Sequence, residues 1–286
     1  MTYFLIALAM LTGIAGCGLG YRAYRRCNLL REHHDQLVGR FRQLESDLIQ
    51  ANKRFCLDKA LRLPESTTAV CTSQHGEDAW LWEQFDFKPE GRYVEVGGHD
   101  GRTFSNSYFF ECIGWDGIVI EANPALAESC RQTRPQATVV HAAVVSDPVV
   151  QEIEFMIPQG APGVSLLGFT REDPSHVQRI RNEGGEIQKV SVPAVTLDAV
   201  LTKHPIETID FVSIDIEGAE MDCLQGFNID RWQPRFVLIE DNSGGLNATV
   251  PQYMQSKGYG LLRRIGCNLV FERQHTATGY SSAGRS

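Results

Sequence analysis

Residues Gly91–Pro124 read GRYVEVGGHDGRTFSNSYFFECIGWDGIVIEANP, and this stretch decides the fold. It contains a short β-rich run at Arg92–Val96, then a glycine cluster, a helix predicted over Phe104–Cys112, and a second apolar run at Gly117–Ile120 that ends on an acid. The order of strand, glycine turn, helix, strand and acid is typical of the first half of a nucleotide-binding α/β domain.

The glycine cluster is made of Gly97, Gly98 and Gly101, with Asp100 embedded in it. Glycine tolerates positive φ and lets the backbone approach a ligand closely. Glu121 follows about 20 residues later, at the tip of the second predicted strand, where an acid typically binds a ribose diol. Together, these features favour a nucleotide-type ligand.

Length, charge and cysteine usage exclude several protein classes. The 286 residues allow one large domain with an appendage, or two small domains. A net charge of −8 argues against a nucleic-acid backbone binder, because there is no basic surplus. The 8 cysteines form no CxxC pair and no zinc-like spacing, so we expect reduced, buried thiols and no metal centre.

The N-terminus begins with an uncharged run at Tyr3–Tyr21, followed at once by three arginines. At about 1.5 Å per residue, the run is long enough to cross most of a ~30 Å hydrocarbon core. Arginines on this side predict a cytoplasmic location for the rest of the chain. A cleaved signal or a lipidated one at Ile14–Cys17 is the alternative, and the lack of a preceding positive charge argues against both. We therefore expect a transmembrane anchor over residues 1–26 and a single-pass membrane protein with a cytoplasmic domain.

Residues 27–66 have a helical, polar pattern. Two heptad series run through it: Leu30, Leu37, Leu44 and Ala51, and His34, Phe41, Leu48 and Phe55. This spacing suits a helix that pairs along one stripe, although His34 interrupts the apolar seam. We expect a short stalk that self-associates weakly or packs on the domain, rather than a stable coiled coil.

A globular domain is predicted over residues 67–274, and a disordered tail over 275–286. Strands and helices alternate after Glu121, which implies a mostly parallel sheet with an antiparallel closing strand. The predicted elements are helix Pro124–Thr133, strands Ala137–Val145 and Gln151–Ile157, helix Leu197–His204, strand Thr208–Ile216, helix Ala219–Gln225, strand Arg235–Glu240, helix Val250–Lys257 and the β-pair of Tyr259–Arg264 with Asn268–Glu272. Gln159–Ser191 is predicted to be irregular, as a lid or substrate loop.

Four predicted strand ends carry polar signals, at Glu95–Gly101, Glu121–Asn123, His141–Ala143 and Asp215–Glu217. Because ligands bind at the carboxyl ends of strands in such sheets, we expect these residues to converge on one crevice. For Asp215, capping of the next helix is the alternative. Upstream, residues 73–78 read SQHGED, and capping and solvation of a helix there is the simplest interpretation.

Five blocks in this order resemble the successive blocks of the FkbM family of S-adenosylmethionine-dependent methyltransferases. They are residues 94–124, HAAVVSD at 141–147, VPAVTLDAVL at 192–201, IDFVSIDIEGAEMDCLQGF at 209–227 and PRFVLIEDN at 234–242. SQHGED is similar to the opening of one branch of that family. The resemblance covers Cys71 to Glu272.

The resemblance implies a Rossmann-like methyltransferase fold, with S-adenosylmethionine as the cofactor. It also implies site residues. Those lining the methionine moiety would be Glu95, Gly97, Gly98, Asp100 and Gly101; those near the ribose and adenine would be Glu121, Asn123, His141, Ala142 and Ala143. Asp215 and Glu217 would face the methyl donor and the acceptor.

The chemistry of methyl transfer agrees with these residues. The sulfonium is an activated donor, so the protein must align an oxygen with the methyl group and exclude water. A carboxylate near the acceptor can take its proton. Asp215 and Glu217 are two apart, so both side chains point the same way on an ideal strand. His99 is a further candidate base, with a polar turn residue as its alternative.

The expected function is therefore that of a membrane-tethered O-methyltransferase acting on a saccharide, a lipid-linked glycan or another hydroxylated small molecule. One alternative is a catalytically silent relative that serves as a membrane-bound interaction or trafficking module. Another is a nicotinamide dehydrogenase, but its GxGxxG fingerprint does not match glycines at 97, 98 and 101.

Overall fold

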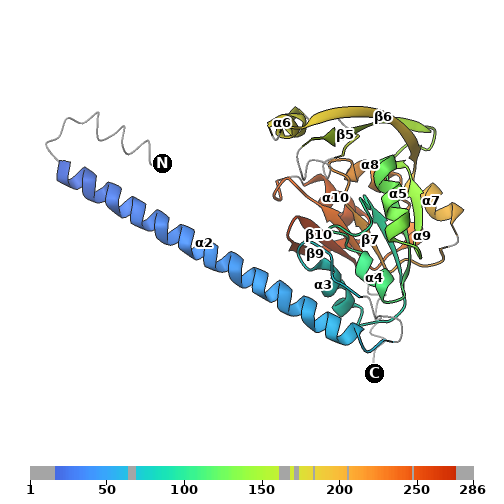
Figure 1. Cartoon of the computed structure of the whole chain (residues 1–286), viewed down its shortest axis with the longest axis horizontal. Helices are drawn as coiled ribbons and strands as arrows, with labels where there is room; N and C mark the ends of the chain where they lie inside the picture. The colour runs from blue at the N-terminus through green and yellow to red at the C-terminus, as the bar shows by residue number, and fades with distance from the viewer. Residues whose placement is uncertain are drawn as a thin grey trace, which may run out of the picture. The chain divides into compact units, whose positions relative to one another are not determined.

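The structure is a computed structural model that describes residues 17–63, 69–160, 168–170, 174–182, 184–204, 206–246 and 248–274. The chain divides into two units, with the boundary between Asn52 and Lys53. The first unit holds most of α2 (Cys17–Ala60), a helix of 44 residues drawn in blue in Figure 1. The second unit holds the last two turns of α2 and all the other elements.

The predicted membrane anchor is not supported. Throughout the described residues, no helix combines the length and the apolar character needed to cross a bilayer. The helix α2 (Cys17–Ala60) runs on through Arg22 into a polar sequence. This finding corrects the predictions of a transmembrane helix and of a single-pass membrane location. Residues 3–16 of the predicted span lie outside the described residues.

The second unit is built on a seven-stranded sheet in the order β3-β2-β1-β7-β8-β10-β9. The strands are β1 (Arg92–Val96), β2 (Asp116–Glu121), β3 (Thr138–His141), β7 (Phe211–Ile214), β8 (Phe236–Glu240), β9 (Tyr259–Ile265) and β10 (Asn268–Arg273). Neighbours from β3 to β8 are parallel, and β10 is antiparallel to both of its neighbours. The prediction of a Rossmann-like, mostly parallel sheet with an antiparallel closing strand is therefore confirmed.

Alternate residues of each strand supply two hydrophobic cores on opposite faces of this sheet. Val94 and Val212 face a core shared with α7 (Leu197–Lys203), α8 (Glu220–Gln225) and α10 (Thr249–Ser256). The strand residues adjacent to these valines point to the other face of the sheet. There they form a second core with α3 (Glu77–Gln84), α4 (Tyr108–Cys112) and the end of α2. The remaining helices of the unit are α5 (Pro124–Thr133), α6 (Pro174–Asn182) and α9 (Ile229–Trp232).

A smaller sheet, in the order β4-β6-β5, lies beyond the main one, at the top of Figure 1. Its strands are β4 (Ala143–Val144), β5 (Glu152–Gln159) and β6 (Glu186–Val195). The prediction that 159–191 is irregular is wrong for α6 and for β6, whose residues 186–193 pair with the whole of β5. Most β6 side chains are exposed or half-buried, so the strand has no apolar pattern, and its pairing with β5 determines its conformation.

Candidate functional site

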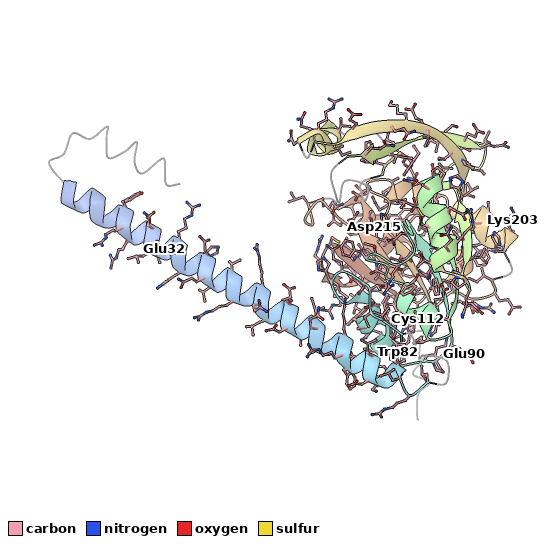
Figure 2. All side chains as sticks on the ribbon, in the orientation of Figure 1. Glu32, Trp82, Glu90, Cys112, Lys203 and Asp215 are labelled. Carbon is pink, nitrogen blue, oxygen red and sulfur yellow. The ribbon has the colours of Figure 1, made fainter. Side chains whose placement is uncertain are left out.

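A cavity of about 380 Å³ opens at the carboxyl ends of β1, β2, β7 and β8. That volume lies in the range of small-molecule and cofactor sites. The β5–β6 sheet contributes Phe155 to its wall, and Figure 2 shows Asp215 on the side of the main sheet that this hairpin occupies. The cavity brings together ten of the predicted site residues: Glu95, Gly97, Gly98, His99, Glu121, Asn123, Ala142, Ala143, Asp215 and Glu217.

Close packing of strand ends explains the first two glycines of the turn after β1. Gly97 has φ +92°, and a Cβ atom there would lie 1.7 Å from the carbonyl oxygen of Asp215. A Cβ atom on Gly98 would lie 2.1 Å from the Cγ1 of Val119 on β2. Both amides donate to the carbonyl of Ile120. The glycines therefore let the chain cross between two strand ends, where any side chain would collide.

Asp100 and Gly101 do not line the cavity in the described structure; they shape the turn. The Asp100 carboxylate accepts from the backbone amides of Arg102 and Thr103, and from the Thr103 hydroxyl. Partial burial opposes ionisation, but these hydrogen bonds prevail and lower the pKa of Asp100 to about 2. Gly101, at φ +85°, would meet the side chain of Arg134 if it carried a Cβ atom.

Glu95 is buried at the end of β1, and its carboxylate organises the segment 105–107. It accepts from the hydroxyls of Ser105 and Ser107 and from the amide of Asn106, at 2.7–3.0 Å. The fully buried Arg134 lies 3.4 Å from Glu95 and is also paired with Glu111. Glu95 thus acts on the cavity through the loop that it holds. No local pattern points to Arg134, because an arginine at the end of a helix usually only stabilises that end.

Glu121 ends β2 and is buried beside the glycine turn. Its carboxylate accepts the amides of His99 at 2.8 Å and Asn123 at 2.7 Å. Burial raises the pKa of Glu121 to about 7, although these two donors favour the charged form. Asn123 caps α5, since its side-chain oxygen accepts the amides of Ala125 and Leu126.

Two histidines were predicted near the ligand, and the structure separates their roles. His99 lines the cavity with φ +50°, and its Nδ1 lies 3.5 Å from a carboxylate oxygen of Asp100. Both ring nitrogens of His99 are buried without a hydrogen-bond partner, so they lack the polar contacts that such atoms usually find. His141 does not line the cavity in the described structure, and its Nε2 lies 3.1 Å from the carbonyl oxygen of Ala122.

Three carboxylates meet where β7 and β8 end. Asp215, Glu217 and Glu240 each place one oxygen within 4.8 Å of the others, close enough that the group could hold a metal ion. Asp215 is exposed to solvent in the open cavity, yet the protein that encloses the cavity, and then the neighbouring Glu240, raise the pKa of Asp215 well above its usual range. Burial, and then the charge of Glu217, raise the pKa of Glu240 to about 7. The sequence analysis named the first two acids and missed Glu240, although it ends a predicted strand.

The SQHGED segment forms one wall of the cavity. Its role is therefore not limited to the helix capping predicted from the sequence. Gln74 and His75 line the cavity, and the acids behind them hold the loop in place. Glu77 accepts the amide of His75 and the side-chain amide of Asn268, both within 2.9 Å. Asp78 accepts the amides of residues 72 and 73 and the hydroxyl of residue 73. Both acids are buried, so this motif forms a rigid loop.

Asn106, in the loop held by Glu95, is hydrogen-bonded to Ser213 on β7. The Nδ2 of Asn106 donates to the Oγ of Ser213 at 3.0 Å, and both side chains line the cavity. Neither was predicted as a site residue. A strand-end pattern could point to Ser213, which lies two residues before Asp215, whereas Asn106 reaches the cavity only because Glu95 fixes its loop.

Comparisons with known proteins agree with the motif blocks. The model of the methyltransferase FkbM domain matches residues 95–261, more than half of the chain. "Methyltransferase sdnD" of Sordaria araneosa is 26% identical over an alignment of 120 residues that covers 36% of this chain and 46% of that protein. The matched region thus spans about half the length of this curated relative.

Solved structures are more distant. A TehB-like SAM-dependent methyltransferase from Corynebacterium glutamicum is 11% identical, with a TM-score of 0.38, over 85% of this chain and all of that one. An O-methyltransferase from Bacillus cereus, in complex with SAH, is 10% identical, with a TM-score of 0.34, over 76% of this chain and 90% of that one. The fold therefore rests on the strand order described above. The family match confirms the resemblance seen in the sequence, and the chain belongs to the methyltransferase FkbM family.

Proposed function

We propose that this chain transfers the methyl group of S-adenosylmethionine to an oxygen of a small hydroxylated acceptor. The observation that carries the proposal is the meeting of Glu121, the glycine turn and three carboxylates in one cavity at the strand ends. Family membership supports the methyl-transfer chemistry. The acceptor oxygen is inferred from the acids that could receive its proton.

The cavity fits a cationic nucleoside ligand. Glu121 would accept the hydroxyls of a ribose with the carboxylate lone pairs that its backbone donors leave free. The unpartnered ring nitrogens of His99 mark a place beside Glu121 where polar atoms of a ligand would be favourable. Desolvation and repulsion between neighbouring carboxylates raise the pKa values of Asp215 and Glu240, and a sulfonium bound nearby would favour the charged forms of both groups.

The residues of the chain would then perform three tasks. Bound in the cavity, S-adenosylmethionine supplies a methyl group that is already activated for transfer. Glu121 and the glycine turn hold the nucleoside in place, while the walls of the cavity exclude water. The carboxylate cluster accepts the acceptor's hydroxyl proton as the oxygen–methyl bond forms. A group with a pKa near 7, as in Glu240, is well matched to this transfer.

The rest of the lining favours a polar acceptor with several hydroxyls. Gln74, Asn106, Asn242 and Asn268 all line the cavity, and a side-chain amide both donates and accepts. Such groups match the hydroxyls of a saccharide, a glycan headgroup or a similar polyol. We therefore propose this class of acceptor.

Calorimetry on the full chain tests the proposal. We expect S-adenosylmethionine and S-adenosylhomocysteine to bind at one site, and NAD to release no heat. Transfer of labelled methyl groups from the cofactor to a panel of saccharides then identifies the acceptor. If NAD bound, and S-adenosylmethionine and S-adenosylhomocysteine did not, the proposal would be overturned. Cofactor binding without transfer to any fraction of a cell extract would indicate a silent, ligand-binding relative.

A further inference from the structure

The helix α2 carries a solvent-exposed seam of apolar side chains. Leu30, Leu37, Phe41, Leu44 and Leu48 are each at least 64% exposed. An exposed helix normally turns its apolar stripe towards a core, because isolated helices gain most of their stability from such packing. Within the described part of the first unit, α2 is the only element, so nothing of that unit covers the seam.

We propose that a second copy of this chain covers the seam, and that residues 27–52 of the two copies form a parallel, in-register coiled coil. The seam has the period of 3.5 residues that allows two identical helices to interlock. Positions d are Leu30, Leu37, Leu44 and Ala51, and positions a are Cys27, His34, Phe41 and Leu48. When the two helices are in register, each residue of the seam packs against the same residue of the other copy. Leucine therefore packs on leucine at three d positions.

The charges that flank the seam agree with the parallel arrangement. Arg40 takes a g position and Glu45 the e position five residues later. In a parallel pair, Arg40 of one copy faces Glu45 of the other, and the contact occurs twice. The next such contact joins Asp47 to Asn52, so like charges do not meet at these positions. Charge complementarity therefore favours a second copy as the occupant.

The seam also sets the strength of the pairing. It extends over less than four heptads, close to the shortest length that sustains a coiled coil. His34 places a polar ring at an a position, which specifies register and oligomer state at a cost in stability. The dimer is therefore expected to be weak and concentration-dependent, with a dissociation constant in the micromolar range.

The mass of the full chain in solution tests the seam. Light scattering and sedimentation should show a monomer–dimer equilibrium for the natural chain. The double variant Leu37→Glu, Leu44→Glu should raise the dissociation constant at least a hundredfold. The matched control is Leu29→Glu, Gln50→Glu, which adds the same charge at exposed c positions and should leave the dimer unchanged. His34→Leu should tighten the dimer at least tenfold.

Cross-linking tests the parallel register. Cys27 is a free cysteine at an a position, so the two copies of this residue should face each other. Mild oxidation with diamide should give a covalent dimer that disappears in Cys27→Ser. Moving the thiol to a b position, with Cys27→Ser and Asn28→Cys, should slow the reaction at least tenfold.

Three outcomes would contradict the proposal or its parallel register. A monomer at all concentrations overturns the proposal, as does a dimer that survives Leu37→Glu, Leu44→Glu. A dimer that depends on the seam but does not cross-link through Cys27 overturns the parallel register. Near-ultraviolet circular dichroism of each variant checks that the globular unit is intact. None of these measurements depends on methyl transfer. Failure of the dimer proposal can therefore be distinguished from failure of the proposed function.

Discussion

A Cβ atom on Gly97 would lie 1.7 Å from the carbonyl oxygen of Asp215, so the ends of β1 and β7 are in direct backbone contact. The amide of Asp215 donates to the carbonyl of Val96, which fixes the same approach from the other side. This one contact therefore positions two parts of the proposed site. They are the turn that would hold the cofactor and the strand end that would receive the proton.

This contact predicts a severe effect of Gly97→Ala. The new methyl group would collide with main chain, and the φ of +92° is unfavourable for any other residue. We expect a loss of about 3 kcal/mol or more in the free energy of unfolding, measured by urea denaturation. Gly39→Ala is the control: position 39 lies in α2 with nothing within 4 Å, so the change should leave the domain unaffected or stabilise the helix. Equal unfolding midpoints for Gly97→Ala and the natural chain would contradict the packing argument.

Glu121→Ala should weaken binding of S-adenosylhomocysteine at least tenfold. Charge-assisted hydrogen bonds to the ribose are each worth about 1.5–3 kcal/mol, and alanine removes them. Because the same carboxylate also accepts the amides of His99 and Asn123, some loss of stability should accompany the change. Calorimetry measures the affinity, and Glu128→Ala, an exposed change on α5, serves as the control. Undiminished affinity in a folded Glu121→Ala protein would place the ribose elsewhere.

Asp215→Asn should slow the chemical step by roughly 10²–10⁴, the usual contribution of a general base. The change keeps the shape of the side chain and leaves Glu217 and Glu240 in place beside the sulfonium, so cofactor affinity should change much less than the chemical step. Single-turnover transfer of a labelled methyl group separates the two effects. Glu217→Gln and Glu240→Gln test whether the cluster acts as a unit, in which case the double variants should be strongly non-additive. Normal turnover in all three single variants would remove the cluster from the mechanism.

The carboxylate cluster also predicts how the stability of the cofactor-free chain depends on pH. The pKa of Glu240 is raised from 4.5 to about 7, so between these values the folded state binds more protons than the unfolded state. Its contribution is therefore fully present below pH 4.5 and is lost as the pH rises through about 7. Glu240→Gln should reduce this fall between pH 5 and pH 8 by roughly 1–2 kcal/mol.

Urea denaturation at several pH values measures this effect, with Glu128→Gln as a control that should keep the natural slope. A slope unchanged in Glu240→Gln would show that this carboxyl does not titrate near pH 7 in the folded chain.

Much of the fold was readable from local patterns. The glycine turn between two β-rich runs, and the acid after the second, identified the start of the sheet, and the five motif blocks identified the family. Elements buried on one or both faces, such as β7 and β8, carry apolar runs that a sequence reveals. The mostly exposed β6 carries no such run and was missed. The membrane anchor was predicted from an uncharged run and the arginines that follow it, and no described helix supports it.

The site was readable only where its residues follow strands directly. Glu121, Asp215 and Glu217 were identified because the carboxyl ends of parallel strands share an edge. Gln74 and Asn268 reach the cavity because Glu77 ties their two segments together from opposite ends of the domain. No local pattern encodes such a contact.

By itself, the sequence determined the fold class, the family, the edge of the sheet where the cavity opens and the heptad seam of α2, because periodicity and motif spacing are local properties of the chain. The tertiary structure alone decided what each polar group does there. Asp100 shapes a turn, Glu95 holds a loop through a network that includes Arg134, and Glu240 joins Asp215 in a cluster with raised pKa values. These roles depend on burial and on partners distant in sequence, and both arise only when the strands and loops pack together.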